Sequence, residues 1–457
     1  MTNTVHPVDQ RLPLAQTLIL GFQHVLVMYS ACIIVPLILG AALQLPKDQL
    51  TLIINADLFA AGLATLVQCA GNRFFGIRLP IMMGVTFASV TPMIAIALNP
   101  SLGLPGVYGA IIASGLFGIL FAPLMGRLLR FFPPVVTGTV LLVIGISLMR
   151  VGIDWSAGGN PVLANGSPNP DYGKPAYLAI SLLQLILILG INRFAKGFLA
   201  NIAVLLGVLA GFFIALLRGD IALDGLQQTP WLATITPFAF GMPKFDVVAV
   251  VSMCLVMLVT MVESTGMFLA LGKMVDRPTT RERLVRGLRS DGLGAILGGV
   301  FNAFPYTSFS QNIGLVTITG VRSRYVCMAG AMILIGLGLF PKLAWIVAST
   351  PQYVLGAAGM VMFGMVTLMG VRILATVDFE RSRSNLLIVA TSVGIGMIPM
   401  VSPQYFHHLP DWCRVFTESG IVLSVCSAML LNLLFNGLGT ADEARAQAAR
   451  SAALGDS

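Results

Sequence analysis

The sequence predicts an all-α polytopic membrane protein. Of its 457 residues, 56% are hydrophobic and only 10% are charged, which leaves too few polar side chains to cover a water-soluble globule of this size. Apolar stretches of roughly 17–25 residues recur from end to end, the length that a helix needs to cross about 30 Å of hydrocarbon. We therefore expect one membrane domain, 1–457, embedded in a lipid bilayer.

Fourteen spans are expected, two of them short and broken. We place them at 14–40, 50–71, 81–99, 105–125, 133–151, 176–192, 199–217, 246–272, 291–302, 308–320, 325–345, 351–371, 385–400 and 415–437. With the N-terminus in the cytoplasm, twenty lysines and arginines fall inside and seven outside. Such a bias indicates cytoplasmic N- and C-termini, with 438–457 as a cytoplasmic tail.

Several classes of function are disfavoured by what the sequence lacks. The basic residues are scattered between apolar spans, so the net charge of +8 does not indicate a nucleic-acid partner. Most of the 6 cysteines lie within or beside apolar spans, and we expect neither a disulfide framework nor a metal site. No phosphate-binding loop or hydrolase motif occurs. We therefore expect no enzyme activity and no cofactor.

The two halves of the chain predict an inverted repeat. The loop 154–175 and the amphipathic stretch 218–244 separate groups of spans, and seven spans lie on each side of the second. An odd number per half orients the halves oppositely. Spans 3 and 10 echo each other around Thr86-Phe87 and Ser308-Phe309, each after a proline-led entry. We expect each to be a short strand plus a half-helix, crossing near the membrane midplane.

Half-helices that begin at the midplane direct their free N–H groups at whatever binds there, which favours an electron-rich or anionic ligand. Gln311 presents a carbonyl and an amino group side by side, which suits a neighbouring N–H and C=O of a planar heterocycle. Asn312, at the expected first turn, could cap free N–H groups and hold the site. Phe87 and Phe309 could sandwich a flat ligand, or simply be core residues.

Three titratable residues are candidates for proton coupling. Glu263 lies inside the span 246–272 with no basic residue nearby in the sequence. Ionising a buried carboxylate is costly, so Glu263 should hold a proton or bind a donor-rich ligand, unless it makes a structural hydrogen bond. Asp291 could be a helix N-cap, an interfacial ion-pair partner or a proton-relay acid. His24 shares the depth of Glu263, although a lone buried histidine is commonly a satisfied core residue.

The residues resemble the nucleobase–ascorbate transporters, also called nucleobase:cation symporter-2. The family signature, Gln/Glu-Asn-x-Gly-x4-Thr-Arg/Lys/Gly, is met by Gln311–Gly314 and Thr319-Gly320, and the resemblance covers nearly the whole chain. It implies a core domain at 14–125 and 246–345, a gate domain at 133–217 and 351–437, a homodimer and an elevator-like movement. Glu263, Gln311, Phe87, Phe309, Ser310 and Thr86 would contact the base, and Asp291, His24 and Asn312 would support proton coupling and site geometry.

Smaller differences point to the substrate. Uracil carriers resemble this pattern but place Glu where this chain has Gln311, so the purine branch is favoured, and long stretches are most similar to bacterial uric acid permeases. Thr319-Gly320, however, is similar to a xanthine-carrier ending. We expect a proton-coupled importer of uric acid, with some xanthine, in the bacterial inner membrane. A xanthine-selective permease, an anion carrier of the same architecture and a non-transporting purine receptor are the alternatives.

Overall fold

A computed structural model describes residues 5–163, 166–380, 382–410 and 413–439 of the chain, so most of the expected tail 438–457 lies outside the described residues. The helices and strands, in chain order, are α1 (Leu14–Leu43), α2 (Lys47–Ala70), β1 (Met83–Val85), α3 (Val90–Leu98), α4 (Gly103–Phe121), α5 (Met125–Leu128), α6 (Pro134–Ser156), α7 (Pro175–Phe194), α8 (Phe198–Asn201), α9 (Ala203–Leu217), α10 (Val247–Met274), α11 (Arg281–Val300), β2 (Tyr306–Ser308), α12 (Ser310–Thr319), α13 (Arg324–Gly338), α14 (Pro341–Ala348), α15 (Gln352–Leu374), α16 (Arg383–Val401), α17 (Arg414–Thr417) and α18 (Gly420–Asn436).

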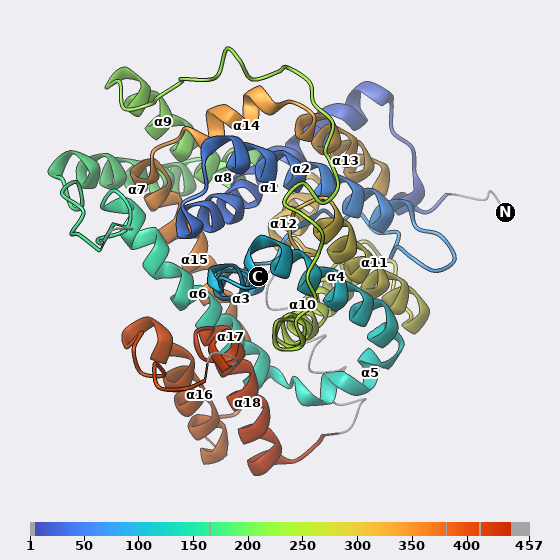
Figure 1. Cartoon of the computed structure of the whole chain (residues 1–457). Helices are drawn as coiled ribbons and strands as arrows, with labels where there is room; N and C mark the ends of the chain where they lie inside the picture. Colours follow the sequence, from blue (N-terminus) through green and yellow to red (C-terminus); the bar gives the residue numbers. More distant parts are fainter. Residues whose placement is uncertain (1–4, 164–165, 381, 411–412, 440–457) are drawn as a thin grey trace.

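The chain is a helical, multi-pass membrane protein (Figure 1). Among the described residues, 8 helices are long and apolar enough to cross a membrane, or 9 if α13 and α14, which meet at an angle of 79°, form one bent span. The eight are α1, α2, α4 with its continuation to Phe131, α6, α7, α10, α15 and α16. Shorter apolar helices follow Phe87 and occupy α9 and α18. The expected total of fourteen spans stays a prediction.

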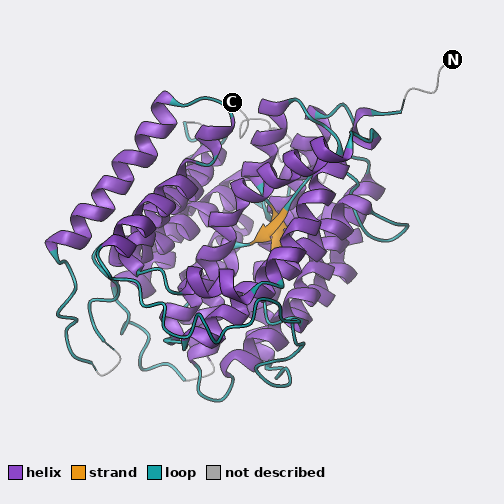
Figure 2. Ribbon diagram, turned by 90° about the horizontal axis from the view of Figure 1, so that it is seen from above, coloured by secondary structure: helices purple, strands orange, loops and turns teal. Residues whose placement is uncertain are grey.

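Two short strands cross in the middle of the helices (Figure 2). β1 and β2 pair antiparallel, with Met83 opposite Ser308 and Val85 opposite Tyr306. The Phe309 amide continues the ladder by donating to Met82 O at 3.0 Å. Strand pairing satisfies backbone groups that hydrocarbon cannot, which is why chain that leaves the helical conformation here is stable. The expected strand in each half, followed by a short helix, is present.

Small residues bring neighbouring helices close together. A Cβ added at Gly62 of α2 would lie 2.7 Å from Ala331 O of α13, and one at Gly115 of α4 would lie 2.5 Å from Gly292 O of α11. A Cβ at Gly145 of α6 would collide with Thr367 of α15. Small residues let helix backbones approach this closely, and the van der Waals contacts that result help to hold helices together in lipid. The division into core and gate domains stays a prediction.

The stretch 218–244 runs as an irregular strap over the ends of several helices (Figure 1). Lys47 Nζ donates to Ala222 O at 2.9 Å, and Phe238 N donates to Val300 O at 3.0 Å. These bonds attach the strap to the start of α2 and the end of α11. The connection between the two halves of the sequence is therefore held along its length.

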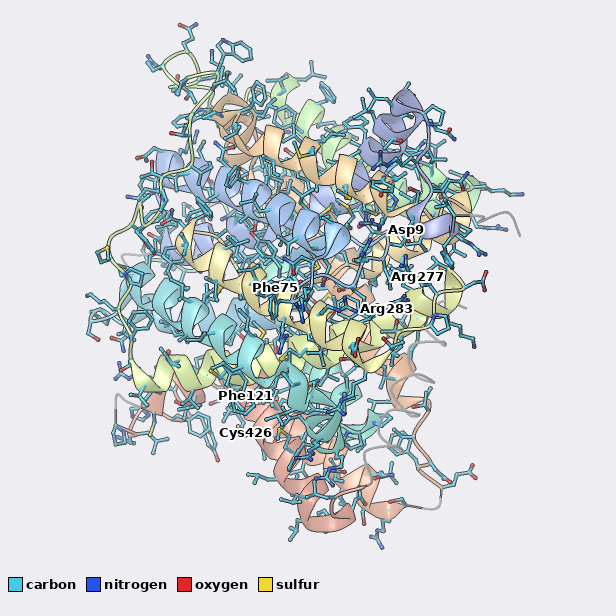
Figure 3. All side chains as sticks on the ribbon, turned by 90° about the vertical axis from the view of Figure 1, so that its right-hand side faces the viewer. Asp9, Phe75, Phe121, Arg277, Arg283 and Cys426 are labelled. Carbon is cyan, nitrogen blue, oxygen red and sulfur yellow. The ribbon has the colours of Figure 1, made fainter. Side chains whose placement is uncertain are left out.

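The N-terminal segment is tied to the helices by ion pairs on Asp9. Its two carboxylate oxygens accept from Arg277 at 2.8 Å and from Arg324 at 2.7 Å, and Figure 3 shows Asp9 and Arg277 at the same end of the molecule. The buried Arg324 also donates to Cys69 O at 2.7 Å, at the end of α2. Although burial would raise the pKa of Asp9, the hydrogen bond from Arg324 and the two guanidinium charges lower it below its usual value.

Candidate functional site

Two adjoining cavities lie beside the strand crossing. The larger, the outer cavity, has a volume of about 400 Å³ and is bordered by α10, α12, α15 and the start of α6. The smaller, the inner pocket, has a volume of about 30 Å³ and reaches β1 and β2. Residues that line both are Leu141, Glu263, Ser310, Gln311, Val366 and Met369. Glu263 and Gln311, predicted from separate segments, thus share one wall.

Glu263 lies in the middle of α10, and its half-buried side chain faces both cavities. The next residue, Ser264, is fully buried and connects α10 to the second strand. Its Oγ lies 3.3 Å from the Thr307 hydroxyl and accepts from Ser308 N at 3.4 Å. Thr307 and Glu263 both line the inner pocket. The acid therefore lies beside β2, which Ser264 ties to the helix of the acid.

The first turn of α12 presents polar groups to the same wall. Phe309 occupies the N-cap position and supplies no side-chain hydrogen bond to the helix, so the first N–H groups are left for other acceptors. Ser310 and Gln311 both line the cavities, and the Ser310 hydroxyl donates to Gln311 Oε1 at 3.3 Å. An uncapped helix N-terminus beside an amide side chain offers several donors to an electron-rich ligand.

Both predicted phenylalanines line the inner pocket. The Phe87 ring meets the Phe363 ring edge to face, with centroids 5.9 Å apart and an angle of 88°. Phe309 is 4% exposed and its ring lies over Gly84, where any Cβ would overlap it. Glycine at position 84 therefore lets Phe309 pack against the first strand. Stacking of a ligand between the two rings stays a prediction.

Thr86 and Asn312 occupy supporting positions. The buried Thr86 hydroxyl accepts from Ala88 N at 3.3 Å, which caps the short 3₁₀ turn before α3, and Thr86 lines neither cavity. Asn312 does lie in the first turn of α12, but capping was the wrong prediction for its side chain. Its amide nitrogen donates to His24 O at 2.9 Å and lies 3.0 Å from His24 Nδ1. The buried His24 thus joins α1 to α12 behind the cavity wall.

The position of Asp291 in the structure rules out two of the three roles predicted for it. Helix α11 begins at Arg281 with Thr280 as its N-cap, so Asp291 lies in mid-helix and is fully buried. Its Oδ1 accepts from Gln68 Nε2 of α2 at 3.1 Å. N-capping is therefore wrong because the helix begins at Arg281, and an interfacial ion pair is wrong because Asp291 is fully buried and forms no ion pair with a described residue. A role in proton relay stays a prediction.

Comparison with known proteins agrees with this architecture. The sequence pattern of the Permease family matches residues 15–405. The chain belongs to this family, the nucleobase–ascorbate transporters. It is 51% identical over 431 residues to the uric acid transporter UacT of Escherichia coli, covering 94% of this chain and 88% of that one. It is 44% identical over 421 residues to a xanthine permease of Bacillus subtilis, covering 92% and 94%.

This permease also shares its fold with a distant solved structure. The transmembrane domain of the cyanobacterial bicarbonate transporter BicA superposes with a TM-score of 0.60 over 93% of this chain and 100% of that domain. At 16% identity, the likeness concerns the fold alone. The family membership establishes the chain as a permease and not an enzyme.

One buried acid of the permease was overlooked in the sequence. Asp57 lies inside the apolar run 50–71, and a carboxylate in such a run is as unusual as Glu263. In the structure its side chain is buried and accepts a hydrogen bond from Tyr306 Oη at 2.8 Å. Gln68, which holds Asp291, was overlooked for the same reason. Both would have emerged from a search for every polar residue inside apolar spans.

Proposed function

We propose that this permease is a proton-coupled symporter that imports purine bases, chiefly uric acid with xanthine as a second substrate. The observation that carries the proposal is the convergence of Glu263 and Gln311 on one wall beside the strand crossing. The choice of substrate is supported by two relatives, a uric acid transporter that is 51% identical and a xanthine permease that is 44% identical.

In this proposal the base binds in the outer cavity with one polar edge toward Gln311 and Glu263. The inner pocket, at about 30 Å³, has room for little more than a water molecule, whereas the outer cavity has about 400 Å³. The Gln311 amide pairs with an adjacent N–H and C=O of the base, and the first N–H groups of α12 donate to its negatively charged atoms. Phe87 and Phe309 contact the ring once the inner pocket widens.

Proton coupling in the proposal rests on Glu263. A neutral Glu263 beside an anionic base avoids placing two negative charges together at membrane depth, so the proton and the substrate favour each other's binding. Among the described residues the inner pocket is lined by no lysine or arginine, whereas Arg372 of α15 lines the outer cavity. Asp291 and His24 hold the geometry through Gln68 and Asn312.

The transport cycle in the proposal is an elevator movement of a core domain against a gate domain within a homodimer. An inverted 7+7 repeat of fourteen spans would place β1 and β2 at corresponding positions of the two halves, and their antiparallel pairing fits opposite orientations. In the proposal the protein lies in the bacterial inner membrane with both termini in the cytoplasm, an orientation that the excess of lysine and arginine in the inside loops supports.

Uptake of labelled uric acid by cells that lack their own carriers tests the proposal. Unlabelled xanthine should compete, and uracil should not, because uracil carriers resemble this pattern but place Glu where this chain has Gln311. Glu263→Ala should abolish accumulation against a gradient, whereas Glu282→Gln, which changes an exposed carboxylate at the start of α11, should not. Accumulation by Glu263→Ala with an unchanged pH dependence would contradict the coupling mechanism.

Proteoliposomes separate the alternatives. A receptor would bind uric acid without net flux, an anion carrier would transport small inorganic anions and ignore purines, and a xanthine-selective permease would take up xanthine but leave uric acid outside. Purified protein that moves uric acid inward when a proton gradient is imposed, and stops when the gradient is collapsed, is the result we expect.

A further inference from the structure

Asp57 is a buried carboxyl group that lines neither cavity. It lies in the middle of α2 with 1% of its surface exposed. Its Oδ1 accepts from Tyr306 Oη at 2.8 Å, and the same phenol lies 3.1 Å from the Asp57 backbone oxygen. The other carboxyl oxygen, Oδ2, is buried without a hydrogen-bond partner among the described residues. A carboxyl group this deep in a membrane protein is costly and is retained where it does something.

The partner of Asp57 belongs to the strand crossing. Tyr306 is the first residue of β2 and pairs with Val85 of β1. Its side chain leaves the strand past Gly294 of α11, where an added Cβ would lie 3.6 Å from Tyr306 Cβ and 3.3 Å from Ala64 Cβ of α2. The ring therefore passes through a narrow gap between α2 and α11 to reach Asp57. Its position is fixed on both sides.

The next residue of the strand faces the site. Successive side chains of a strand point to opposite faces, so Thr307 points away from Asp57. Thr307 lines the inner pocket with Glu263, and its hydroxyl lies 3.3 Å from Ser264 Oγ. β2 has three residues, and so short a strand pair is not stable without outside contacts. Asp57 holds one face of β2, and Ser264 holds the other.

We propose that the Asp57 carboxyl is a positioning residue for the substrate site, acting through Tyr306 to hold Thr307 against Glu263. What the site requires from Asp57 is a hydrogen-bond acceptor for the phenol rather than a charge. This inference rests on the proposed function for its substrate, uric acid, but the hydrogen-bonded chain from α2 to α10 does not depend on which base is carried.

Four variants test it: Asp57→Ala, Asp57→Asn, Tyr306→Phe and the double variant Asp57→Ala/Tyr306→Phe. Asp48→Ala is the matched control, because Asp48 is an exposed carboxylate in the first turn of the same helix. The measurements are KM and maximal rate of uric acid uptake, corrected for the amount of protein in the membrane. We expect KM to rise about tenfold in Asp57→Ala and in Tyr306→Phe, the usual order for a lost buried hydrogen bond.

Two further comparisons separate positioning from a general loss of stability. Asp57→Asn keeps an acceptor for the phenol and should stay within about threefold of the unchanged protein. The double variant should be no worse than either single variant, because both remove the same bond. The inference is overturned if Asp57→Ala and Tyr306→Phe keep the original KM, or if Asp57→Asn is as impaired as Asp57→Ala. If Asp57→Ala fails to reach the membrane, Tyr306→Phe, which removes one oxygen atom, decides the matter.

A second readout keeps the inference separate from the choice of substrate. Absence of uric acid uptake by the unchanged protein would refute the proposed function and not the role of Asp57. The variant Thr307→Cys can then be labelled with a small thiol reagent. Its labelling rate, measured by mass spectrometry and compared with that of the protein that keeps Thr307, reports where residue 307 points. Asp57→Ala should alter the labelling rate several-fold and Asp57→Asn should leave it unchanged. Equal rates in all three backgrounds would refute the positioning role.

Discussion

Replacing Gly84 with alanine tests how tightly the first strand and Phe309 define the site. The added methyl carbon would overlap Cδ2 and Cε2 of the Phe309 ring and lie 3.2 Å from Cγ, where ordinary contact begins at 3.4 Å. Phe309 is 4% exposed, so the ring has little room to retreat except into the inner pocket. Either the ring enters the pocket or the strands separate. Both outcomes disturb the wall formed by Glu263 and Gln311.

The magnitude follows from the cost of overpacking. An extra methyl group in a filled core costs about 1–3 kcal/mol. If that cost is met in the substrate-bound state, KM for the base rises about 5- to 150-fold, since about 1.4 kcal/mol corresponds to a factor of ten. The assay is the concentration dependence of labelled uric acid uptake, with thermal stability of the purified protein measured beside it.

The control for this experiment is Gly336→Ala in α13, where an added Cβ meets nothing within 4 Å. It should leave KM and stability unchanged. A compensating exchange is also available: Phe309→Leu in the Gly84→Ala protein removes the ring atoms that collide and should recover part of the stability. An unchanged KM and an unchanged melting temperature in Gly84→Ala would refute the argument that Phe309 and Gly84 are packed as described.

Two other predictions concern Asn312 behind the site and the ion pairs of Asp9 at the N-terminal segment. Asn312→Ala removes both interactions with His24 and should raise KM about tenfold, whereas Asn436→Ala at the exposed end of α18 should have no effect on uptake. Asp9→Asn leaves the buried Arg324 without its carboxylate and should lower the free energy of unfolding by about 1–2 kcal/mol at pH 7. Because folding lowers the pKa of Asp9, the difference in free energy of unfolding between the two proteins should persist above about pH 4. It should vanish as the pH falls through the lowered pKa of Asp9. A difference in melting temperature that stays constant down to about pH 3 would contradict this prediction.

Local sequence signals predicted the framework of the site well. Leu79-Pro80 and Phe304-Pro305 interrupt apolar runs, and the strands begin shortly afterwards, β1 at Met83 and β2 at Tyr306. The helix that follows the second strand begins at Ser310, so Gln311 and Asn312 fall in its first turn as expected. These features depend on proline and on a change of periodicity, which are properties of the chain within a few residues.

Predictions that depended on partners in other helices were less successful. Asp291 follows a basic run that resembles a loop, yet the threonine at 280 caps a helix that carries this run and continues past the acid. Asn312 is a residue type that caps helices, but His24 of α1 lies within its reach and accepts its hydrogen bond. Gln68, the partner of Asp291, and His24, the partner of Asn312, are both distant in the sequence. Only the packing of α1, α2 and α11 around the strands decides which polar group meets which.

The helix that organises the site contributes no residue to the lining of either cavity. α2 carries Asp57, Thr65 and Gln68 on one face, at spacings that a helix brings into line. Asp57 holds Tyr306 of β2, Thr65 Oγ1 accepts from Met83 N of β1 at 2.9 Å, and Gln68 donates to Asp291 of α11. Each bond fixes one of the elements that surround the crossing. A rigid α2 would therefore keep both strands and α11 in register if the site moves across the membrane as one body. This role accounts for the burial of these three polar side chains on a helix that does not line either cavity.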